Sequence, residues 1–99
     1  MDTVVAANQG EQVGGNKSAS VGGNYSISAG KDMSVSVGKK FSLSAGDQIT
    51  LATGSASITL KKDGTIDIKG KDITINGSGK ITIKASSDMV LKGSKINQN

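Results

Sequence analysis

The chain has 99 residues and a formal net charge of +4, with 34% hydrophobic and 2% aromatic residues and no Cys, His, Pro or Trp. This length suits one small domain, and the lack of Cys and His excludes a disulfide framework and thiolate or imidazole metal ligands in this chain. With so few large apolar side chains, a globule of one chain would gain little free energy from burial to offset its loss of chain entropy. We therefore expect partner chains.

The N-terminal residues 1–12 are expected to be a linker or lead-in to a repeat that fills residues 13–99. The first residues, Met1-Asp2-Thr3-Val4-Val5, carry no basic segment, and their apolar stretch is too short for a secretory signal. No apolar run approaches the roughly 20 residues that span a membrane. If the protein leaves a cell, a route other than general secretion is expected to carry it.

Glycine recurs every eight residues through the first half of the chain. Gly, together with Asn or Asp, supplies the positive φ angles that tight corners need, so we expect one corner in each octad. The periodic glycines are Gly14, Gly22, Gly30, Gly38, Gly46 and Gly54.

Pairs of apolar residues follow these glycines and continue after the glycines fade. Their first members are spaced by 8, 8, 8, 9, 8, 7, 8 and 8 residues, so one residue is gained near 52–57 and one is lost near 69–72. The nine pairs are Tyr25 with Ile27, Met33 with Val35, Phe41 with Leu43, Ile49 with Leu51, Ile58 with Leu60, Ile66 with Ile68, Ile73 with Ile75, Ile81 with Ile83 and Met89 with Leu91.

The residue between the two members of a pair is polar in every case except Val90. Alternate residues of a strand point to opposite sides, so both apolar members of a pair face the same way. In a helix they would lie about 200° apart and form no coherent apolar face. The pattern therefore predicts an all-β chain in which each octad is a strand of three or four residues followed by a corner.

Three such octads would go once around a triangular prism with the apolar pairs inside. One chain could coil on itself as a short solenoid, or three chains could wind together, each filling every third layer. We favour the trimer because a short solenoid has large uncapped ends, and because winding pairs the backbone edges of each chain with its neighbours. The predicted fold is an intertwined homotrimeric triple-stranded β-helix, a prism-shaped needle with the nine pairs as its trimer core.

The residues of this repeat resemble those of known needles. The run Val21-Gly22-Gly23-Asn24-Tyr25-Ser26-Ile27-Ser28, repeated as Val37-Gly38-Lys39-Lys40-Phe41-Ser42-Leu43-Ser44, resembles the octapeptide repeat of phage tail spikes. The stretch from Asp72 to Asn97 looks like the C-terminal end of VgrG, the spike of the bacterial type VI secretion system. The resemblance covers residues 13–99 and implies a fragment, since the hub-like and OB-fold parts of VgrG do not fit residues 1–12.

The resemblance implies a structural, cell-puncturing spike and not an enzyme. Family spikes sit on a tube of stacked rings, are driven out by sheath contraction, breach a target envelope mechanically and carry effectors. This implies assembly in the bacterial cytoplasm followed by expulsion to the outside or into the target cell. Some phage needles bind iron through His, but this chain has no His, so no metal or other cofactor is expected. A needle of a contractile phage or pyocin-like particle is the alternative.

The repeat ends without a closing aromatic residue or proline. Continuing it would place apolar residues near 97 and 99, yet Ile96 is followed by Asn97-Gln98-Asn99. Three copies would leave a flat platform, which predicts a docking surface for the PAAR-like tip protein that caps family spikes; a frayed terminus is the alternative. The expected tip-partner residues are Leu91, Lys92, Gly93, Ser94, Lys95, Ile96 and Asn97.

Three other functions fit the sequence less well. A Ca²⁺-binding solenoid would need a Gly-Gly-x-Gly-x-Asp nonapeptide. Neither Gly14-Gly15 nor Gly22-Gly23 is followed by the Gly-x-Asp of that motif. A glycan- or phospholipid-binding fibre would need aromatic platforms, but Tyr25 and Phe41 take inward places. Residues 61–99 hold the whole net charge of +4, yet without Arg or stacking aromatics they predict a solvated face and no nucleic-acid partner. The many Ser residues lie at outward or corner places, so no catalytic residue is expected.

Overall fold

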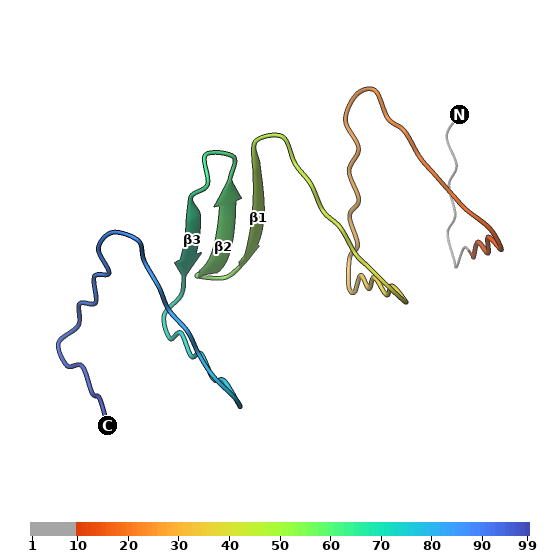
Figure 1. Cartoon of the computed structure of the whole chain (residues 1–99). Helices are drawn as coiled ribbons and strands as arrows, with labels where there is room; N and C mark the ends of the chain where they lie inside the picture. The colour runs from red at the N-terminus through yellow and green to blue at the C-terminus, as the bar shows by residue number, and fades with distance from the viewer. Residues whose placement is uncertain (1–9) are drawn as a thin grey trace. The chain divides into compact units, whose positions relative to one another are not determined.

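The computed structural model describes residues 10–99, so most of the expected lead-in lies outside the described residues. The chain divides into two units, Met1–Lys40 and Phe41–Asn99. The described part is all-β and contains no helix. Its strands are β1 (Gln48–Thr53), β2 (Ala56–Lys61) and β3 (Ile66–Lys69), which lie side by side as one antiparallel sheet in the order β1-β2-β3 (Figure 1).

Bends and turns divide both units with the predicted period. Outside the sheet, the segments between bends are extended and form no strand in the described residues. After the glycines end, Lys71, Ser78, Ser86 and Ser94 begin bends, so the corner does not require glycine. The prediction of one corner in each octad is confirmed. The bends and turns begin at residues 14, 22, 30, 38, 46, 54, 62, 71, 78, 86 and 94.

The predicted conformation of the corners is wrong at most positions. Only Gly54, with φ of 55°, and Gly64, with φ of 96°, have positive φ in the described part of the chain, and no Asn or Asp there does. Both glycines lie where the chain reverses completely, and a tight reversal requires positive φ. The other bends redirect an extended chain without reversing it, and ordinary negative φ suffices for that change of direction.

The first reversal joins β1 to β2 through the two-residue loop Gly54-Ser55. Thr53 pairs with Ala56, and Gly54 has positive φ while Ser55 does not, which is the pattern of a type II′ turn. At the far end of the hairpin, the Lys62 backbone N–H donates to the Asp47 carbonyl at 3.0 Å, which extends the pairing beyond the assigned strands.

The second reversal joins β2 to β3 through the three-residue loop Lys62-Asp63-Gly64. The Gly64 N–H donates to the Lys61 carbonyl at 3.0 Å, and the Lys61 N–H donates to the Thr65 carbonyl at 3.0 Å. Positive φ at the third loop residue completes a type I turn with a G1 bulge, one of the commonest three-residue hairpin loops. We call residues 48–69, which contain both reversals, the meander.

Loop length explains the irregular step in the spacing of the apolar pairs. A one-residue slip moves every side chain of a strand to the other face of its sheet. With a two-residue loop, Leu51 pairs with Ile58 only if the next apolar pair begins nine residues after Ile49, as it does. With a three-residue loop, a step of eight from Ile58 brings Ile66 opposite Leu60. The extra residue is thus what a two-residue loop between two apolar pairs requires.

The meander also corrects the prediction for this part of the chain. We expected three consecutive octads to occupy three different faces of a prism, each with a strand of three or four residues. Here β1, β2 and β3 have 6, 6 and 4 residues and pair with one another in a single sheet, which can form only one face of a prism. The longer strands can pair within the chain because both loops reverse its direction.

Candidate assembly surface

One side of the meander gathers three of the predicted core pairs. Ile49 pairs with Leu60, and Leu51 pairs with Ile58, while Ile58 and Leu60 pair in turn with Ile68 and Ile66. Directly paired residues share a face of an antiparallel sheet, so the prediction that the members of a pair point the same way is confirmed for these pairs. The apolar face consists of Ile49, Leu51, Ala56, Ile58, Leu60, Ile66 and Ile68.

The other side of the meander is polar. Thr50, Thr59 and Asp67, the middle residues of the three pairs, are directly aligned across the sheet. Thr59 and Asp67 are half-buried, as is Ser57 beside them. The polar side of the sheet is therefore partly covered by its own neighbours.

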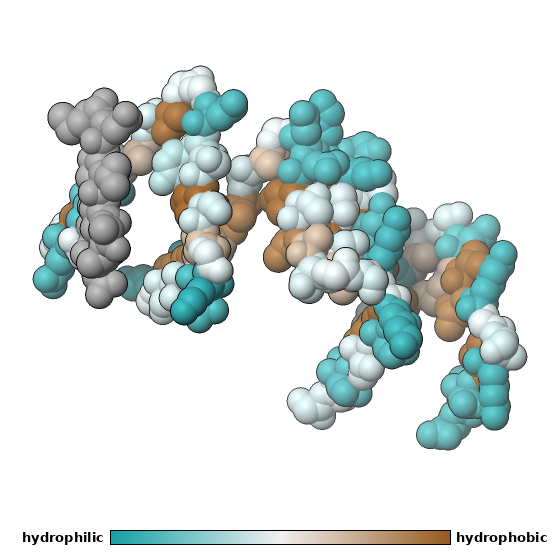
Figure 2. All heavy atoms as spheres, turned by 180° about the vertical axis from the view of Figure 1, so that it is seen from behind, coloured by the Kyte–Doolittle hydropathy of each residue, from teal (hydrophilic) through white to brown (hydrophobic). Residues whose placement is uncertain are grey.

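The apolar face is open in the single chain. Leu60 is 38% exposed, Ile58 42% and Ile66 62%, although Ile58 and Leu60 lie on the central strand. No residue of the described part is buried, and hydrophobic residues lie openly at the surface beside hydrophilic ones (Figure 2). Burying an exposed Leu or Ile side chain stabilises a protein by about 1.5–3 kcal/mol, so this face favours a partner strongly.

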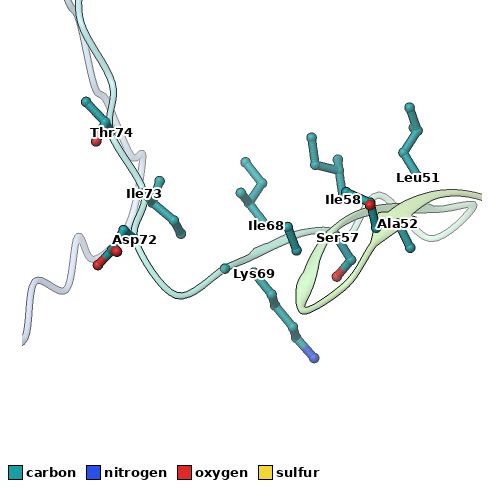
Figure 3. A pocket seen from close by; sticks show the side chains of 12 residues that line it. Leu51, Ala52, Ser57, Ile58, Ile68, Lys69, Asp72, Ile73 and Thr74 are labelled. Carbon is teal, nitrogen blue, oxygen red and sulfur yellow. The ribbon is translucent and has the colours of Figure 1, made fainter.

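A hollow of about 620 Å³ lies where the apolar face meets the next corner. Leu51, Ile58 and Ile68 project to one side of the sheet, while Lys69 projects to the opposite side (Figure 3). After Lys69 the chain turns away from the sheet, and Ile73 lines the hollow from beyond the corner (Figure 3). The hollow is thus apolar on two sides and opens toward solvent.

The core pairs predicted in the first unit are exposed in the single chain. We expected Tyr25, Ile27, Met33 and Val35 to be core residues, but Val35 is 60% exposed and Tyr25 is 67% exposed. Ile27 and Met33 are as open as Val35. The reason is that no other segment of the described chain pairs with this part, so one copy has nothing with which to cover these side chains.

The core pairs predicted in the second unit outside the meander are exposed as well. Their open fractions run from 49% at Met89 to 72% at Ile75, and Ile83 is 69% exposed. One chain therefore does not bury these residues, and their place in a core stays a prediction about the assembly. They are Phe41, Leu43, Ile73, Ile75, Ile81, Ile83, Met89 and Leu91.

The predicted tip-partner residues form an extended segment with a bend at Ser94. Leu91 is 65% exposed and Ile96 is 61% exposed. Neither belongs to a strand, so this end of the chain presents apolar side chains without a sheet to hold them. Lys92, Gly93, Lys95 and Asn97 are exposed as well.

Charged groups lie at the turns and ends of the meander. The Asp63 carboxylate accepts a hydrogen bond from the Thr65 backbone N–H at 3.0 Å. This bond, with the one from the Thr65 hydroxyl, lowers the pKa of Asp63 below its ordinary value of 3.8. Lys62 Nζ lies 3.5 Å from Asp47 Oδ1 across the first hairpin, and Lys17 contacts Glu11 in the first unit.

Among residues 10–99, no group of three or more His, Cys, Asp or Glu side chains is placed to hold a metal ion. The same residues include no helix with the length and apolar character needed to cross a bilayer. Comparison with protein-family models and with curated proteins gives no match.

Two features of the meander were not expected from the sequence. Ala56 joins the apolar face opposite Thr53, although it belongs to no apolar pair. Asp63-Gly64, flanked by alternating apolar residues on both sides, is a strong short-range hairpin signal that would have located the second reversal.

Proposed function

We propose that the chain is a structural spike: three copies wind into a β-helical needle that punctures a target envelope as part of a type VI secretion machine. One observation carries the proposal. Corners recur every eight residues along a chain whose large hydrophobic side chains are exposed, apart from the half-buried Ile49, over the described residues. A regular repeat that cannot cover its own apolar residues needs identical neighbours with the same period.

The mechanism of such a spike needs no reactive group. Inward apolar pairs fill a dry axis, and closed hydrogen-bond ladders between chains resist shear. Chains that wind around each other must unwind over many layers before they separate, so unfolding is slow. The needle therefore transmits axial force from a contracting sheath without coming apart, and it acts as a mechanical part rather than an enzyme.

The partners follow from this arrangement. Residues 91–97 form a platform for a PAAR-like tip protein, and through it the spike carries effectors. Exposed apolar side chains at Leu91 and Ile96 support this role, because an uncovered final layer favours a cap. Domains on the N-terminal side connect the needle to the tube of rings, so the spike is assembled in the bacterial cytoplasm and then expelled. The alternative is the tail spike needle of a contractile phage or pyocin-like particle, which would use the same trimeric fold in a different machine.

Light scattering after size-exclusion chromatography tests the assembly. The expected mass is three times the chain's 10.0 kDa. We also expect trimer bands that survive unheated detergent gels, because the chains are intertwined. A monomer at all concentrations would overturn the proposal.

A functional replacement tests the role. Residues 13–99 would replace the needle of a VgrG in a bacterium with an active type VI system, and release of the ring protein would be measured. We expect release to be sustained, and to be lost in a matched chimera carrying Ile81→Asp. A trimeric replacement that supports no release would contradict the spike function while leaving the fold intact.

A truncation tests the platform. Deleting residues 93–99 is expected to leave the trimer intact and to abolish binding of a PAAR-like protein in a pull-down. If the truncated needle keeps its partner at full affinity, the platform is not where the cap docks.

A further inference from the structure

The outer edge of β3 has no strand beside it in the described chain. The sheet order is β1-β2-β3, so Ile66–Lys69 pairs on one side only. The next apolar triplet, Ile73-Thr74-Ile75, is extended but lies beyond the corner at Lys71-Asp72 and pairs with no strand. Unpaired strand edges readily add a strand from another chain.

Three-fold symmetry decides which strand reaches this edge. When one chain leaves its sheet at the corner, its residues 73–75 move to the neighbouring face, one layer beyond the β3 of the copy on that face. Each copy therefore receives residues 73–75 from one neighbour and gives its own to the other. This contact requires the proposed trimer, but a trimer could form without it.

We infer that the free edge of β3 pairs with residues 73–75 of a second copy, so that the meander is the segment where the chains pass from pairing with themselves to pairing with each other. The occupant is a second copy of this chain because the two triplets match. Both are apolar–polar–apolar, so Ile73 and Ile75 stack on Ile66 and Ile68 while Thr74 lies beside Asp67, whichever way the strands run.

Hydrogen-bonding capacity supports the match. Asp67 is the only acidic residue among the nine middle positions, and a carboxylate only accepts hydrogen bonds. Within the chain its direct cross-strand partner is Thr59, whose hydroxyl can donate. A second hydroxyl, from Thr74 of the neighbouring copy, gives the carboxylate a donor on its other side.

The hollow beside the sheet fits the same arrangement. Ile58 and Ile68 line it from the sheet and Ile73 from beyond the corner. Ile73 of the second copy, paired at the edge of β3, projects its side chain toward this space. The contact therefore covers both a free backbone edge and an apolar hollow.

Disulfide trapping tests this contact, because the chain has no native Cys. In the double variant Asp67→Cys/Thr74→Cys, bonds between copies close a covalent ring of three chains. After oxidation and denaturation, we expect a trimer band on a non-reducing gel that collapses to monomer with reductant. A second double variant, Ser42→Cys/Thr50→Cys, probes the equivalent edge at β1, where residues 41–43 of another copy are expected.

The matched control is Thr59→Cys/Asp67→Cys, which joins residues that pair directly within one chain. It should give a covalent monomer under the same oxidation. Light scattering of the unoxidised variants separates the possible failures. Trimers whose Asp67→Cys/Thr74→Cys chains oxidise only to monomer would overturn this contact and leave the trimer standing. A monomeric wild-type chain would overturn the proposed function, and the contact with it.

Discussion

The meander and the octads outside it are built from the same apolar–polar–apolar triplet, yet only the meander pairs within the chain. Two loops make the difference. At Gly54-Ser55 and at Lys62-Asp63-Gly64 the chain reverses, whereas at the other corners it only changes direction. The triplet decides which way side chains point, and the loop decides where the next strand goes.

The comparison also shows what glycine does in each region. In the meander, Gly54 and Gly64 have positive φ, which L-residues adopt at a cost of roughly 1–2 kcal/mol. Outside it, a Cβ added at Gly14, Gly22, Gly30, Gly38 or Gly46 would meet nothing within 4 Å in its own chain. Any steric reason for these glycines must therefore come from neighbouring copies.

The largest expected effect comes from a charge on the apolar side in either region. Ile58→Asp in the meander and Ile81→Asp outside it should each prevent trimer formation, since three unpaired carboxylates around the axis cost several kcal/mol apiece. Thr59→Asp and Thr82→Asp, one residue along, should be mild. The measurement is mass by light scattering. If Ile58→Asp still forms a trimer while Ile81→Asp does not, the meander lies outside the core.

A register change should have the next largest effect. Deleting Ser55 shortens the nine-residue step to eight, so the two-residue type II′ loop can no longer bring Leu51 and Ile58 to the same face. Each side chain turned out of the core loses about 1.5–3 kcal/mol, and the thermal midpoint should fall steeply. Deleting the whole octad 30–37 instead keeps every step intact and should leave the meander and the trimer intact. Equal loss from both deletions would show that the step does not matter.

A smaller effect is expected from the turn glycines. Gly54→Ala and Gly64→Ala should each destabilise the protein by about 1–2 kcal/mol per chain, because Ala is strained at positive φ. Denaturant unfolding would measure this, with Gly30→Ala as the comparison outside the meander. A larger loss at Gly30 than at Gly54 would mean that close approach between copies, and not turn conformation, dominates the glycine requirement.

The smallest effect concerns acid. The pKa of Asp63 is lowered by the Thr65 backbone and hydroxyl, so its contribution is present above the unfolded value near 3.8 and is lost as pH falls through the lower folded value. Asp63 is exposed, so we expect only a slight fall in the unfolding midpoint below that pH. Asp63→Asn should remove this part of the acid dependence while keeping an acceptor for the Thr65 N–H. An unchanged acid slope in Asp63→Asn would show that the turn is not sensitive to this charge.

Much of the local structure could be predicted from the sequence. The eight-residue period located the corners, and the alternation within triplets such as Ile58-Thr59-Leu60 correctly assigned the faces of the meander. The reversals were not predicted, because a triplet has the same pattern whether its backbone pairs with its own chain or with another. Asp63-Gly64 and the nine-residue step after Ile49 carried that information, and the step was interpreted only as an irregularity. The structure of a single chain does not test the predicted trimer core or the predicted tip. One chain leaves residues such as Val35 and Ile83 exposed, and their burial depends on contacts with other copies.

The gain and the loss of one residue cancel across the meander. A turn begins at residue 54 and a bend at residue 78, three octads later, so the bends from residue 78 onward keep the phase of those before the meander. In the proposed trimer, three meanders would contribute nine strands stacked as three layers of about 14 Å in total, the same height as nine strands from ordinary octads. The meander would thus occupy the same length of the needle as three ordinary octads. In the proposed needle, inserting or removing a whole meander or a whole octad would therefore change the length without changing the register of the sequence on either side.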